Sequence, residues 1–293
     1  MWKSRWGGKS VGRLTGSTIK SPEIGQRWLG SLLLIVLLGV LPACGSKKAV
    51  SVNEVKHRGK LVAGVKFDSK PFGFLDTDGQ LKGYDIDLMR ELSRRLLGKE
   101  KGVEFQQVLS STRVIAINSG SVDAVAATMT ITPERAKVVD FSIPYLTAHQ
   151  AVVVPSDSPA RHLKDLDGKT ILFVLGTTSE GNIKKRLPDA KYTGFKSSTD
   201  AFSALKAGRG DAMTTDDTII SGFLSDNCGF RVLDEKLSDE PYGLAFRKGG
   251  AETPDDLRVQ VNQSLKVMEK DGTLARLKAK WVDSMLKGKP CKR

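Results

Sequence analysis

Short apolar runs alternate with helical patterns along most of the chain, and this alternation constrains the fold more than any other feature. Residues 61–65, Leu-Val-Ala-Gly-Val, are typical of a strand, whereas residues 84–97 carry apolar side chains near 3.6-residue spacing, which indicates a helix. Further strands are predicted at 103–108 and 122–127, with a helix at 113–118 between them. A β-α-β-α-β order of this kind predicts a largely parallel sheet with helices on its faces.

A second block of the same kind begins after Pro144. Its predicted strands are residues 151–154, 170–174, 192–195 and 211–215, and its predicted helices are residues 179–187, 198–207 and 217–224. A strand is then predicted at 242–246, and helices at 257–268 and 274–285, with Gly272 as the break between them. The chain is therefore expected to form two similar α/β halves.

The first residues have the pattern of a secretory signal. Basic side chains precede a twelve-residue apolar core at 29–40, which is too short to span a bilayer comfortably. Residues 41–44, Leu-Pro-Ala-Cys, resemble a bacterial lipobox, although Pro42 replaces the usual small residue. We expect residues 1–43 to be a lipoprotein signal peptide and Cys44 to carry the lipid that anchors the chain to the outer face of the cytoplasmic membrane. Ordinary cleavage of a secreted protein, or a short membrane anchor, is the alternative.

Two cysteines remain once Cys44 is assigned to the lipid anchor. Cys228 and Cys291 are then the only pair in an exported chain, where thiols tend to be oxidised, and a disulfide between them is expected. Two free thiols are the alternative. The chain has no Cys-x-x-Cys motif and its three histidines are isolated, so no metal site is predicted.

The charge and motif content exclude several classes of function. Without residues 1–43 the chain holds 40 Lys and Arg against 32 Asp and Glu, a net charge of +8 that is spread along the sequence. No basic block with interleaved aromatic residues is present, so no nucleic-acid partner is predicted. The Gly-x-Ser-x-Gly and His-Glu-x-x-His motifs are also missing, so neither a catalytic residue nor a cofactor is predicted.

The segment that follows the predicted strand 122–127 gathers groups that bind a small carboxylate. Residues 128–135, Thr-Met-Thr-Ile-Thr-Pro-Glu-Arg, provide hydroxyl groups, backbone amides and Arg135, whose planar guanidinium matches a carboxylate. Taken alone, the segment also suits a helix capped by Thr132, with Pro133 in its first turn and a surface arginine. The motif resembles that of the family 3 solute-binding proteins of bacterial amino-acid ABC importers. In that family its threonines and arginine hold the α-carboxylate of a bound amino acid.

The resemblance extends over residues 53–285 and implies a complete fold. That fold is α/β and of the type II periplasmic-binding-protein kind, with two lobes joined by a two-strand hinge and a ligand cleft between them. Small polar residues predict a flexible linker at 44–53. The divisions that the resemblance implies are the first part of lobe 1 at 54–143, lobe 2 with the hinge crossings at 144–241, and the return to lobe 1 with a C-terminal tail at 242–293. The crossings would lie near 144–150 and 237–242, where bending would close the cleft.

The resemblance also implies which residues of lobe 1 hold the backbone of the ligand. Arg135 would pair with the α-carboxylate, and Thr130 would add a hydroxyl group and a backbone amide. The carbonyl oxygen of Thr128 would accept a hydrogen bond from the α-ammonium group.

Lobe 2 would complete the site with an acid and a loop. By the same resemblance, Asp216 would pair with the α-ammonium group, and Thr177 and Thr178 would offer amides and hydroxyls at a helix N-terminus. From the residues alone, Asp216 also suits the N-cap of the helix that follows it, and Ser179 suits a cap of its own helix.

Two basic residues would select the side chain of the ligand. Arg113 stands fifteen residues before Thr128, where glutamate and aspartate binders of the family place an arginine, and Lys66 stands where they place a second base. Either residue alone is equally compatible with a solvated surface charge. Ser198 departs from that branch, which has a histidine near the ligand at this position.

The expected function is that of a non-catalytic receptor. Three bases against the single acid Asp216 would give the site a positive charge, which glutamate would balance better than glutamine. We expect a lipid-anchored monomer that captures glutamate or aspartate and delivers it to a membrane permease driven by a cytoplasmic ATPase. A binder of glutamine or another polar amino acid, and an enzyme of the cyclohexadienyl dehydratase type on the same fold, are the alternatives.

Overall fold

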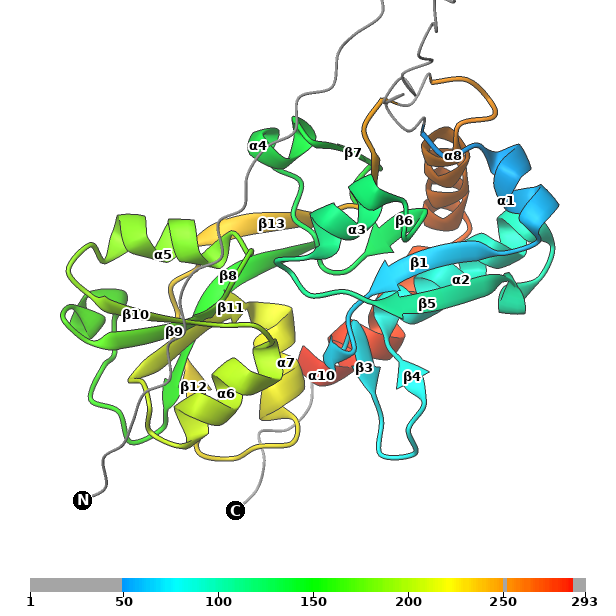
Figure 1. Ribbon diagram of the computed structural model, residues 1–293. Helices are drawn as coiled ribbons and strands as arrows, with labels where there is room; N and C mark the ends of the chain where they lie inside the picture. Colours follow the sequence, from blue (N-terminus) through cyan, green and yellow to red (C-terminus); the bar gives the residue numbers. More distant parts are fainter. Residues whose placement is uncertain (1–48, 250–251, 287–293) are drawn as a thin grey trace, which may run out of the picture. The chain divides into compact units, whose positions relative to one another are not determined.

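The computed structural model describes residues 49–249 and 252–286 (Figure 1). The expected signal peptide at 1–43, the expected lipidation site Cys44 and the expected disulfide partner Cys291 lie outside these ranges. Among the described residues, no helix has both the length and the apolar character needed to cross a membrane. The described chain forms two α/β lobes, each built around its own sheet.

Lobe 1 contains a five-stranded sheet in the order β5-β1-β6-β14-β7. Its strands are β1 (Leu61–Val65), β5 (Val103–Gln107), β6 (Ala124–Ala126), β7 (Val139–Phe141) and β14 (Ala245–Arg247). β1 is parallel to β5 and β6, as the predicted alternation of strands and helices requires. β14 alone runs the other way, antiparallel to β6 and β7, so four of the five strands share one direction and the prediction of a largely parallel sheet is confirmed. Local periodicity could not reveal this pairing, because β14 returns from the other lobe.

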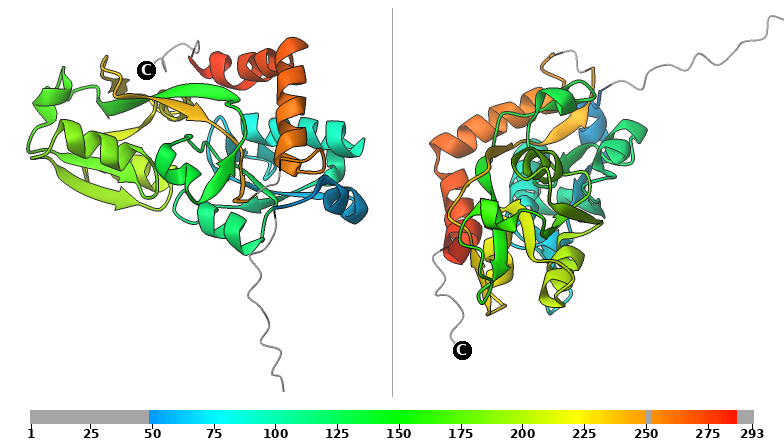
Figure 2. Two further views of the ribbon diagram at one scale, coloured as in Figure 1. Left: turned by 90° about the horizontal axis from the view of Figure 1, so that it is seen from above. Right: turned by 90° about the vertical axis from the view of Figure 1, so that its left-hand side faces the viewer.

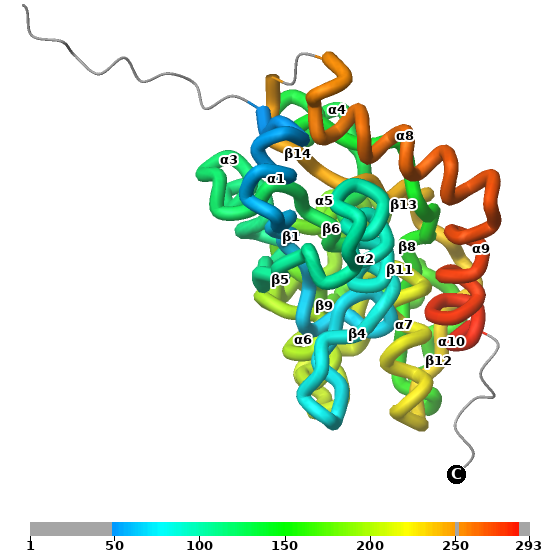
Figure 3. The backbone as a smooth tube through the Cα atoms, turned by 90° about the vertical axis from the view of Figure 1, so that its right-hand side faces the viewer, coloured from blue at the N-terminus to red at the C-terminus, as the bar shows by residue number. Residues whose placement is uncertain are grey.

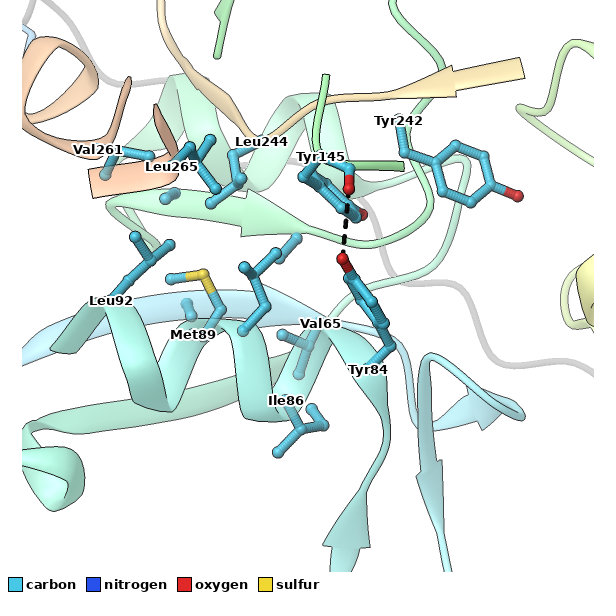
Figure 4. Packing of buried hydrophobic residues seen from close by; sticks show 14 of the residues in the cluster. Val65, Tyr84, Ile86, Met89, Leu92, Tyr145, Tyr242, Leu244, Val261 and Leu265 are labelled. Carbon is cyan, nitrogen blue, oxygen red and sulfur yellow. Dashed lines mark hydrogen bonds between the residues drawn. The ribbon is translucent and has the colours of Figure 1, made fainter. Parts of the chain in front are cut away.

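The helices of lobe 1 come from both ends of the described chain. They are α1 (Val52–Arg58), α2 (Tyr84–Leu97), η1 (Glu100–Gly102), α3 (Arg113–Ser119), α4 (Pro133–Ala136), α8 (Leu257–Lys270), α9 (Thr273–Lys278), η3 (Ala279–Asp283) and α10 (Ser284–Leu286). α2 buries Ile86, Met89 and Leu92 in one cluster with residues of β1 and α8 (Figure 4), and each such side chain stabilises the fold by about 1.5–3 kcal/mol. α8 and α9 lie beside α2 (Figure 3), where Arg95 donates to Asp271 at 2.7 Å.

Residues 52–53, which were predicted to be linker, form the start of α1, and Ser51 is its N-cap. The Ser51 hydroxyl accepts a hydrogen bond from the backbone N–H of Glu54 at 3.3 Å, and the Glu54 carboxylate accepts one from the N–H of Ser51 at 3.2 Å. This reciprocal pair is a capping box, and it satisfies two N–H groups at the helix start. Val52 and Val55 are buried in the core of lobe 1, so the predicted linker was too long at its C-terminal end.

Lobe 2 contains a six-stranded sheet in the order β10-β9-β11-β8-β12, with β13 also paired to β8. Its strands are β8 (Leu146–Pro155), β9 (Thr170–Val174), β10 (Lys191–Phe195), β11 (Ala212–Asp216), β12 (Phe230–Val232) and β13 (Ser238–Tyr242). Its helices are η2 (Leu163–Leu166), α5 (Ser179–Arg186), α6 (Ser198–Lys206) and α7 (Asp217–Leu224). Alternate residues of β8 enter two separate cores: Val152 and Val154 enter one, and Ala151 and Val153 enter the other. Side chains on a strand alternate between its faces, so both faces of this sheet are covered.

Strands β8 and β13 connect the two lobes. They pair with each other in antiparallel register, from Leu146 opposite Tyr242 to Gln150 opposite Ser238. Segments from both ends of the described chain, blue to cyan and orange to red, lie together in Figure 2, apart from the yellow-green strands of lobe 2. The two crossing strands therefore lie between the sheet of lobe 1 and the sheet of lobe 2.

The predicted single strand at 242–246 is wrong, because β13 ends at Tyr242 and β14 begins at Ala245. The chain changes partners between them, and the N–H of Gly243 donates to the carbonyl of Met129 at 3.0 Å. A Cβ atom on Gly243 would lie 2.8 Å from the end of the Ile131 side chain, which would have to shift to make room for it. An uninterrupted apolar run in the sequence gives no sign of such a change of sheet.

A three-stranded sheet of β2 (Asp68–Ser69), β3 (Gly73–Leu75) and β4 (Leu81–Lys82) follows β1. Its first strand faces lobe 2, because the N–H of Ser198 at the start of α6 donates to the Asp68 carboxylate at 2.9 Å. The described structure therefore has its lobes in direct contact at this point.

Candidate functional site

One cavity collects all eight residues that were predicted to bind the ligand. It is lined by Lys66, Ser110, Arg113, Thr128, Thr130, Arg135, Thr177, Thr178, Ser179, Ser198, Thr215, Asp216 and Ile219. Both lobes contribute to this lining, because some of these residues follow strands of lobe 1 and others follow strands of lobe 2. The cavity thus lies at the carboxyl ends of strands, where open α/β sheets usually bind ligands.

Arg135 is held in place by the short helix α4. The Thr132 hydroxyl caps α4 by accepting from the N–H of Arg135 at 3.2 Å, as the sequence predicted. The guanidinium does not point to the surface, since Nη1 donates to the Thr130 carbonyl at 2.8 Å and Nη2 donates to the Gly176 carbonyl of lobe 2 at 3.0 Å. Burial lowers the pKa of Arg135, and the charge of Glu240 opposes this effect.

Thr128 adopts a left-handed backbone conformation with φ of 46° at the end of the β6 segment. This region is unfavourable for a residue with a branched side chain and costs about 1–3 kcal/mol. It turns the Thr128 N–H toward the Asp85 carboxylate, to which it donates at 3.3 Å, while the Thr128 carbonyl accepts from Arg113 at 3.3 Å. Strain of this kind at a cavity wall suits a binding site, where it fixes the direction of backbone groups.

Arg113 is the first residue of α3 and is 2% exposed. Its Nη1 donates to the Ala127 carbonyl at 2.6 Å, and its Nη2 donates to the Gly176 carbonyl at 3.4 Å. Its Nε is buried without a hydrogen-bond partner among the described residues. Burial, and then the charge of Arg135, lowers the pKa of Arg113 to about 9. A buried donor without an acceptor is costly, so an acceptor atom in the cavity would be stabilising here.

Lys66 follows β1 and is 1% exposed, which excludes a solvated surface charge. Its Nζ lies 3.9 Å from the Asp68 carboxylate. Burial lowers the pKa of Lys66 to about 8, although Asp68 opposes that change. A buried ammonium group at this distance from its partner retains hydrogen-bonding capacity for a ligand.

Asp216 closes the cavity on the side of lobe 2. It stands at the N-cap position of α7, but its side chain makes no capping bond there and instead accepts a hydrogen bond from the Tyr242 hydroxyl. Burial, and then the negative charge of Glu240, raises the pKa of Asp216 to about 7. The alternative interpretation of Asp216 as a helix cap is therefore not supported. Ser179 also makes no side-chain cap at the start of α5.

Glu240 is a residue of the site region that the sequence did not reveal. It is 1% exposed on β13, and its Oε2 accepts from the hydroxyls of Thr130 at 2.5 Å and Thr178 at 2.7 Å. Its Oε1 accepts from Ser238 at 2.5 Å and Asn182 at 3.3 Å. Glu240 thus joins a threonine of each lobe, and the hydroxyl protons of both threonines are used in doing so.

Asp85 is a second missed residue, and it lies under the cavity at the start of α2. It is fully buried and accepts a hydrogen bond from the Tyr145 hydroxyl at 2.9 Å. Burial raises the pKa of Asp85 to about 6, while the hydrogen bond from Tyr145 opposes that change. Tyr145 and Tyr242 stand on the two crossings, and Tyr145 accepts from the Tyr84 hydroxyl at its carbonyl (Figure 4). An acid in the apolar stripe of a helix was the one sequence signal that could have identified Asp85.

The charge balance of the site involves more acids than the prediction considered. Four carboxyl groups, rather than one, act on the three bases of the cavity. They belong to Asp68, Asp85, Asp216 and Glu240. With every group ionised, the set of four acids and three bases carries one net negative charge. Only Asp216 among these acids lines the cavity, so the lining itself has the three bases and the one acid that were predicted. Asp68, Asp85 and Glu240 lie outside the lining, and sequence proximity to the motif could not identify them.

The cavity has the chemistry to hold an amino-acid zwitterion. Guanidinium groups are available to a carboxylate, and Asp216 and the Thr128 carbonyl are available to an ammonium group. In the described part of the chain, no group of three or more His, Cys, Asp or Glu residues could hold a metal ion.

Comparisons with known proteins agree with this geometry. The model of the family described as bacterial extracellular solute-binding proteins, family 3, matches residues 61–284. The ABC transporter glutamine-binding protein GlnH of Bacillus subtilis is 38% identical over 266 residues, covering 86% of this chain and 96% of the relative. The glutamine-binding protein of Geobacillus stearothermophilus is 39% identical over 251 residues, covering 78% of this chain and 95% of the relative. The solved structure of an ancestral arginine-binding protein bound to glutamine is 41% identical, with a TM-score of 0.71 over 76% of this chain and 98% of that chain.

Proposed function

The chain belongs to the bacterial extracellular solute-binding proteins of family 3 and is an amino-acid-binding protein of an ABC transporter, and from this premise we propose that its ligand is glutamine. This proposal replaces the expectation of glutamate or aspartate. The observation that carries it is the charge balance around the cavity, where Asp216 in the lining and three acids outside it act on three bases.

The charge balance favours a ligand without net charge. Glutamate would bring a second carboxylate to three bases whose charge Asp216 and three acids outside the lining already offset, and uncompensated buried charge costs several kcal/mol. Glutamine is a zwitterion, so its α-carboxylate and α-ammonium groups leave the net charge of the site unchanged. Two relatives that are named glutamine-binding proteins support the same choice.

The side-chain amide of glutamine also suits the bases of the cavity. Its carbonyl oxygen would accept hydrogen bonds from the buried Arg113 Nε or the Lys66 ammonium group, both of which are available. Its NH₂ group would donate to an acceptor of the cavity lining, whereas a carboxylate side chain could use the same bases but has no proton to donate.

We assign the backbone of the ligand to the remaining predicted residues. Arg135 would hold the α-carboxylate, with backbone amides near Thr177 and Thr178, and Asp216 would hold the α-ammonium group. The Thr130 and Thr178 hydroxyls donate to Glu240, so only their lone pairs would face the ligand. This differs from the expected role of Thr130, whose hydroxyl was to donate to the carboxylate.

Glutamate is the second candidate, because Lys66 and Arg113 are both buried in the cavity. Calorimetric titration of ligand-free protein with glutamine, glutamate, aspartate, asparagine and arginine separates the candidates. We expect glutamine to bind at least tenfold more tightly than glutamate at pH 7.5. Tighter binding of glutamate would overturn the argument from charge balance and restore the first expectation.

We further propose that the mature protein is a lipid-anchored monomer that delivers its ligand to a membrane permease powered by a cytoplasmic ATPase. The support is the family membership and the Leu-Pro-Ala-Cys sequence at 41–44. Labelled palmitate should be incorporated into the wild type and not into Cys44→Ser; equal labelling of both proteins would contradict the anchor. We assign no catalytic activity, and turnover of a carboxylated ring substrate would favour the dehydratase alternative.

A disulfide between Cys228 and Cys291 completes the proposal. Cys228 is disulfide-bonded in the structure, which supports this proposal. Cys291 lies outside the described residues. Exported thiols are usually oxidised, so the bridge would persist in that compartment.

A further inference from the structure

Asp68 stands on β2 of lobe 1 and bonds to the start of α6 in lobe 2. Its Oδ2 accepts from the backbone N–H of Ser198 at 2.9 Å, and its backbone carbonyl accepts from the Thr199 hydroxyl at 3.2 Å. Ser198 is the first residue of α6, so its N–H has no partner within the helix. A negative carboxylate at this end of a helix is further stabilised by the helix dipole.

The other oxygen of the same carboxylate faces the cavity side of lobe 1. Oδ1 lies 3.9 Å from the ammonium group of Lys66, which lines the cavity, and it accepts from the Ser69 hydroxyl at 3.3 Å. The Asp68 side chain is 13% exposed, so water competes little for these contacts. One carboxylate therefore contacts a residue that the ligand would touch and also the helix of the opposite lobe.

We propose that Asp68 is a positioning residue that couples occupation of the cavity to contact between the lobes. The inference rests on the proposed function, in which Lys66 meets the side chain of a bound amino acid. A ligand that fixes Lys66 also fixes the Asp68 carboxylate, and the carboxylate then holds the Ser198 N–H. Because β2 and α6 belong to different lobes, this bond must break when the cleft opens, and it therefore slows release of the ligand.

A neighbouring ion pair provides a matched control. Lys70, two residues after Asp68, donates to the Asp226 carboxylate of lobe 2 at 2.8 Å, but these side chains are 26% and 60% exposed. Exposed ion pairs contribute little, so Lys70→Ala removes a contact between the lobes without touching the cavity. Gly222 supplies the opposite control, because a Cβ atom there would lie 2.2 Å from the Lys70 carbonyl and would hold the lobes apart.

The test measures the rates of glutamine binding and release by stopped-flow fluorescence. In Asp68→Ala we expect the dissociation rate to rise about tenfold to a hundredfold, with a much smaller change in the association rate. Asp68→Asn should fall between this variant and the wild type, because its amide oxygen can still accept from Ser198 but carries no charge for Lys66. Lys70→Ala should change the rate less than about threefold, and Gly222→Ala should raise it strongly.

Coupling through Lys66 is tested by a double-mutant cycle. In the double variant Lys66→Met/Asp68→Ala, the change in dissociation rate should differ from the sum of the changes, on a free-energy scale, in Lys66→Met and Asp68→Ala. Additive changes would show that Asp68 acts on the fold alone. Thermal unfolding of each ligand-free variant separates loss of fold from loss of coupling. A dissociation rate in folded Asp68→Ala within twofold of the wild type, or equal to that of Lys70→Ala, would overturn the proposal.

The experiments also distinguish failure of the proposed glutamine binding from failure of the proposed role of Asp68. If the wild type binds none of the five amino acids, glutamine capture is wrong, and small-angle X-ray scattering of ligand-free proteins then decides the role of Asp68. A larger radius of gyration in Asp68→Ala than in the wild type would support the contact between the lobes. Identical radii would overturn it.

Discussion

Glutamine binding is expected to weaken as the pH falls below 7, because Asp216 must be ionised to pair with the α-ammonium group. Burial, and then the charge of Glu240, raises the pKa of Asp216 to about 7. A bound ammonium group favours the ionised carboxylate and so lowers this pKa again. By linkage, the ligand binds the ionised form preferentially, and its affinity rises with pH until Asp216 has lost its proton.

The magnitude follows from the pKa of Asp216 in the ligand-free protein. With a pKa of about 7, roughly one tenth of the Asp216 side chains are ionised at pH 6 and roughly one hundredth at pH 5. The affinity at pH 5 should therefore be about a hundredfold below its plateau near pH 8, which corresponds to about 2.7 kcal/mol. Asp85, whose pKa burial raises to about 6, adds to the loss only at the acidic end of this range.

Calorimetry at pH 5, 6, 7 and 8 measures this dependence in the wild type and in Asp216→Asn. The variant should bind more weakly at pH 8, and its affinity should change less than about threefold between pH 6 and pH 8. Asp85→Asn is the second variant, and it should retain the wild-type dependence above pH 6. A wild-type affinity that stays constant from pH 5 to pH 8, or that is highest at pH 5, would refute the pairing of Asp216 with the ammonium group.

The contribution of Asp216 to folding stability should fall as the pH rises, whereas glutamine affinity should increase. The pKa of Asp216 is higher in the folded protein than its ordinary value of 3.8, so the group favours the folded state below about pH 4 and loses this contribution as the pH rises toward 7. The difference in melting temperature between ligand-free wild type and Asp216→Asn should therefore change with pH across this window. A constant difference from pH 4 to pH 7 would show that Asp216 does not titrate there.

Three further predictions concern other residues. Arg135→Ala should lower glutamine affinity by roughly thirtyfold to a few thousandfold with little change in melting temperature, and wild-type affinity in calorimetry would remove Arg135 from the site. Arg113→Ala should weaken glutamate by tenfold or more relative to its effect on glutamine, since bonds to charged groups are stronger; equal losses in parallel titrations would assign Arg113 to the fold. Reduction of a Cys228–Cys291 bridge should lower stability by about 2–4 kcal/mol in denaturant unfolding, whereas two alkylatable thiols in unreduced protein would exclude the bridge.

The local elements were predictable because their signals are local. The helix at 84–97 and the strand at 61–65 were both predicted with the bounds that α2 and β1 have. Each carries an apolar pattern that matches its own period, and each packs in the core that this pattern implies. The split of 242–246 into two strands was not predictable in this way, because only the tertiary structure requires the chain to leave one sheet and enter the other.

The binding residues were predictable as a set, but their protein partners were not. Arg113 and Arg135 line one cavity, as the family resemblance implies, yet both donate to the Gly176 carbonyl of the opposite lobe. That contact joins residues 41 and 63 positions apart in the sequence, and no motif records it. Glu240 was missed for the same reason, since it reaches Thr130 from 110 positions away through the pairing of the two crossing strands.

The missed acids change the conclusion about the ligand, because specificity depends on the sum of the charges in a buried site. Considered without their protein partners, Lys66 and Arg113 would favour a ligand with an acidic side chain, as any pair of bases without acidic neighbours would. In the folded protein Asp68 acts most strongly among the charged groups on Lys66, and Glu240 does so on Arg135, so part of the positive charge is already compensated before a ligand arrives. A carboxylate would then compete with these acids for the same bases, whereas an amide can accept from a base and donate to an acid at once. The pairing of the cavity's bases with acids around it is therefore a physical reason to expect a neutral amide side chain.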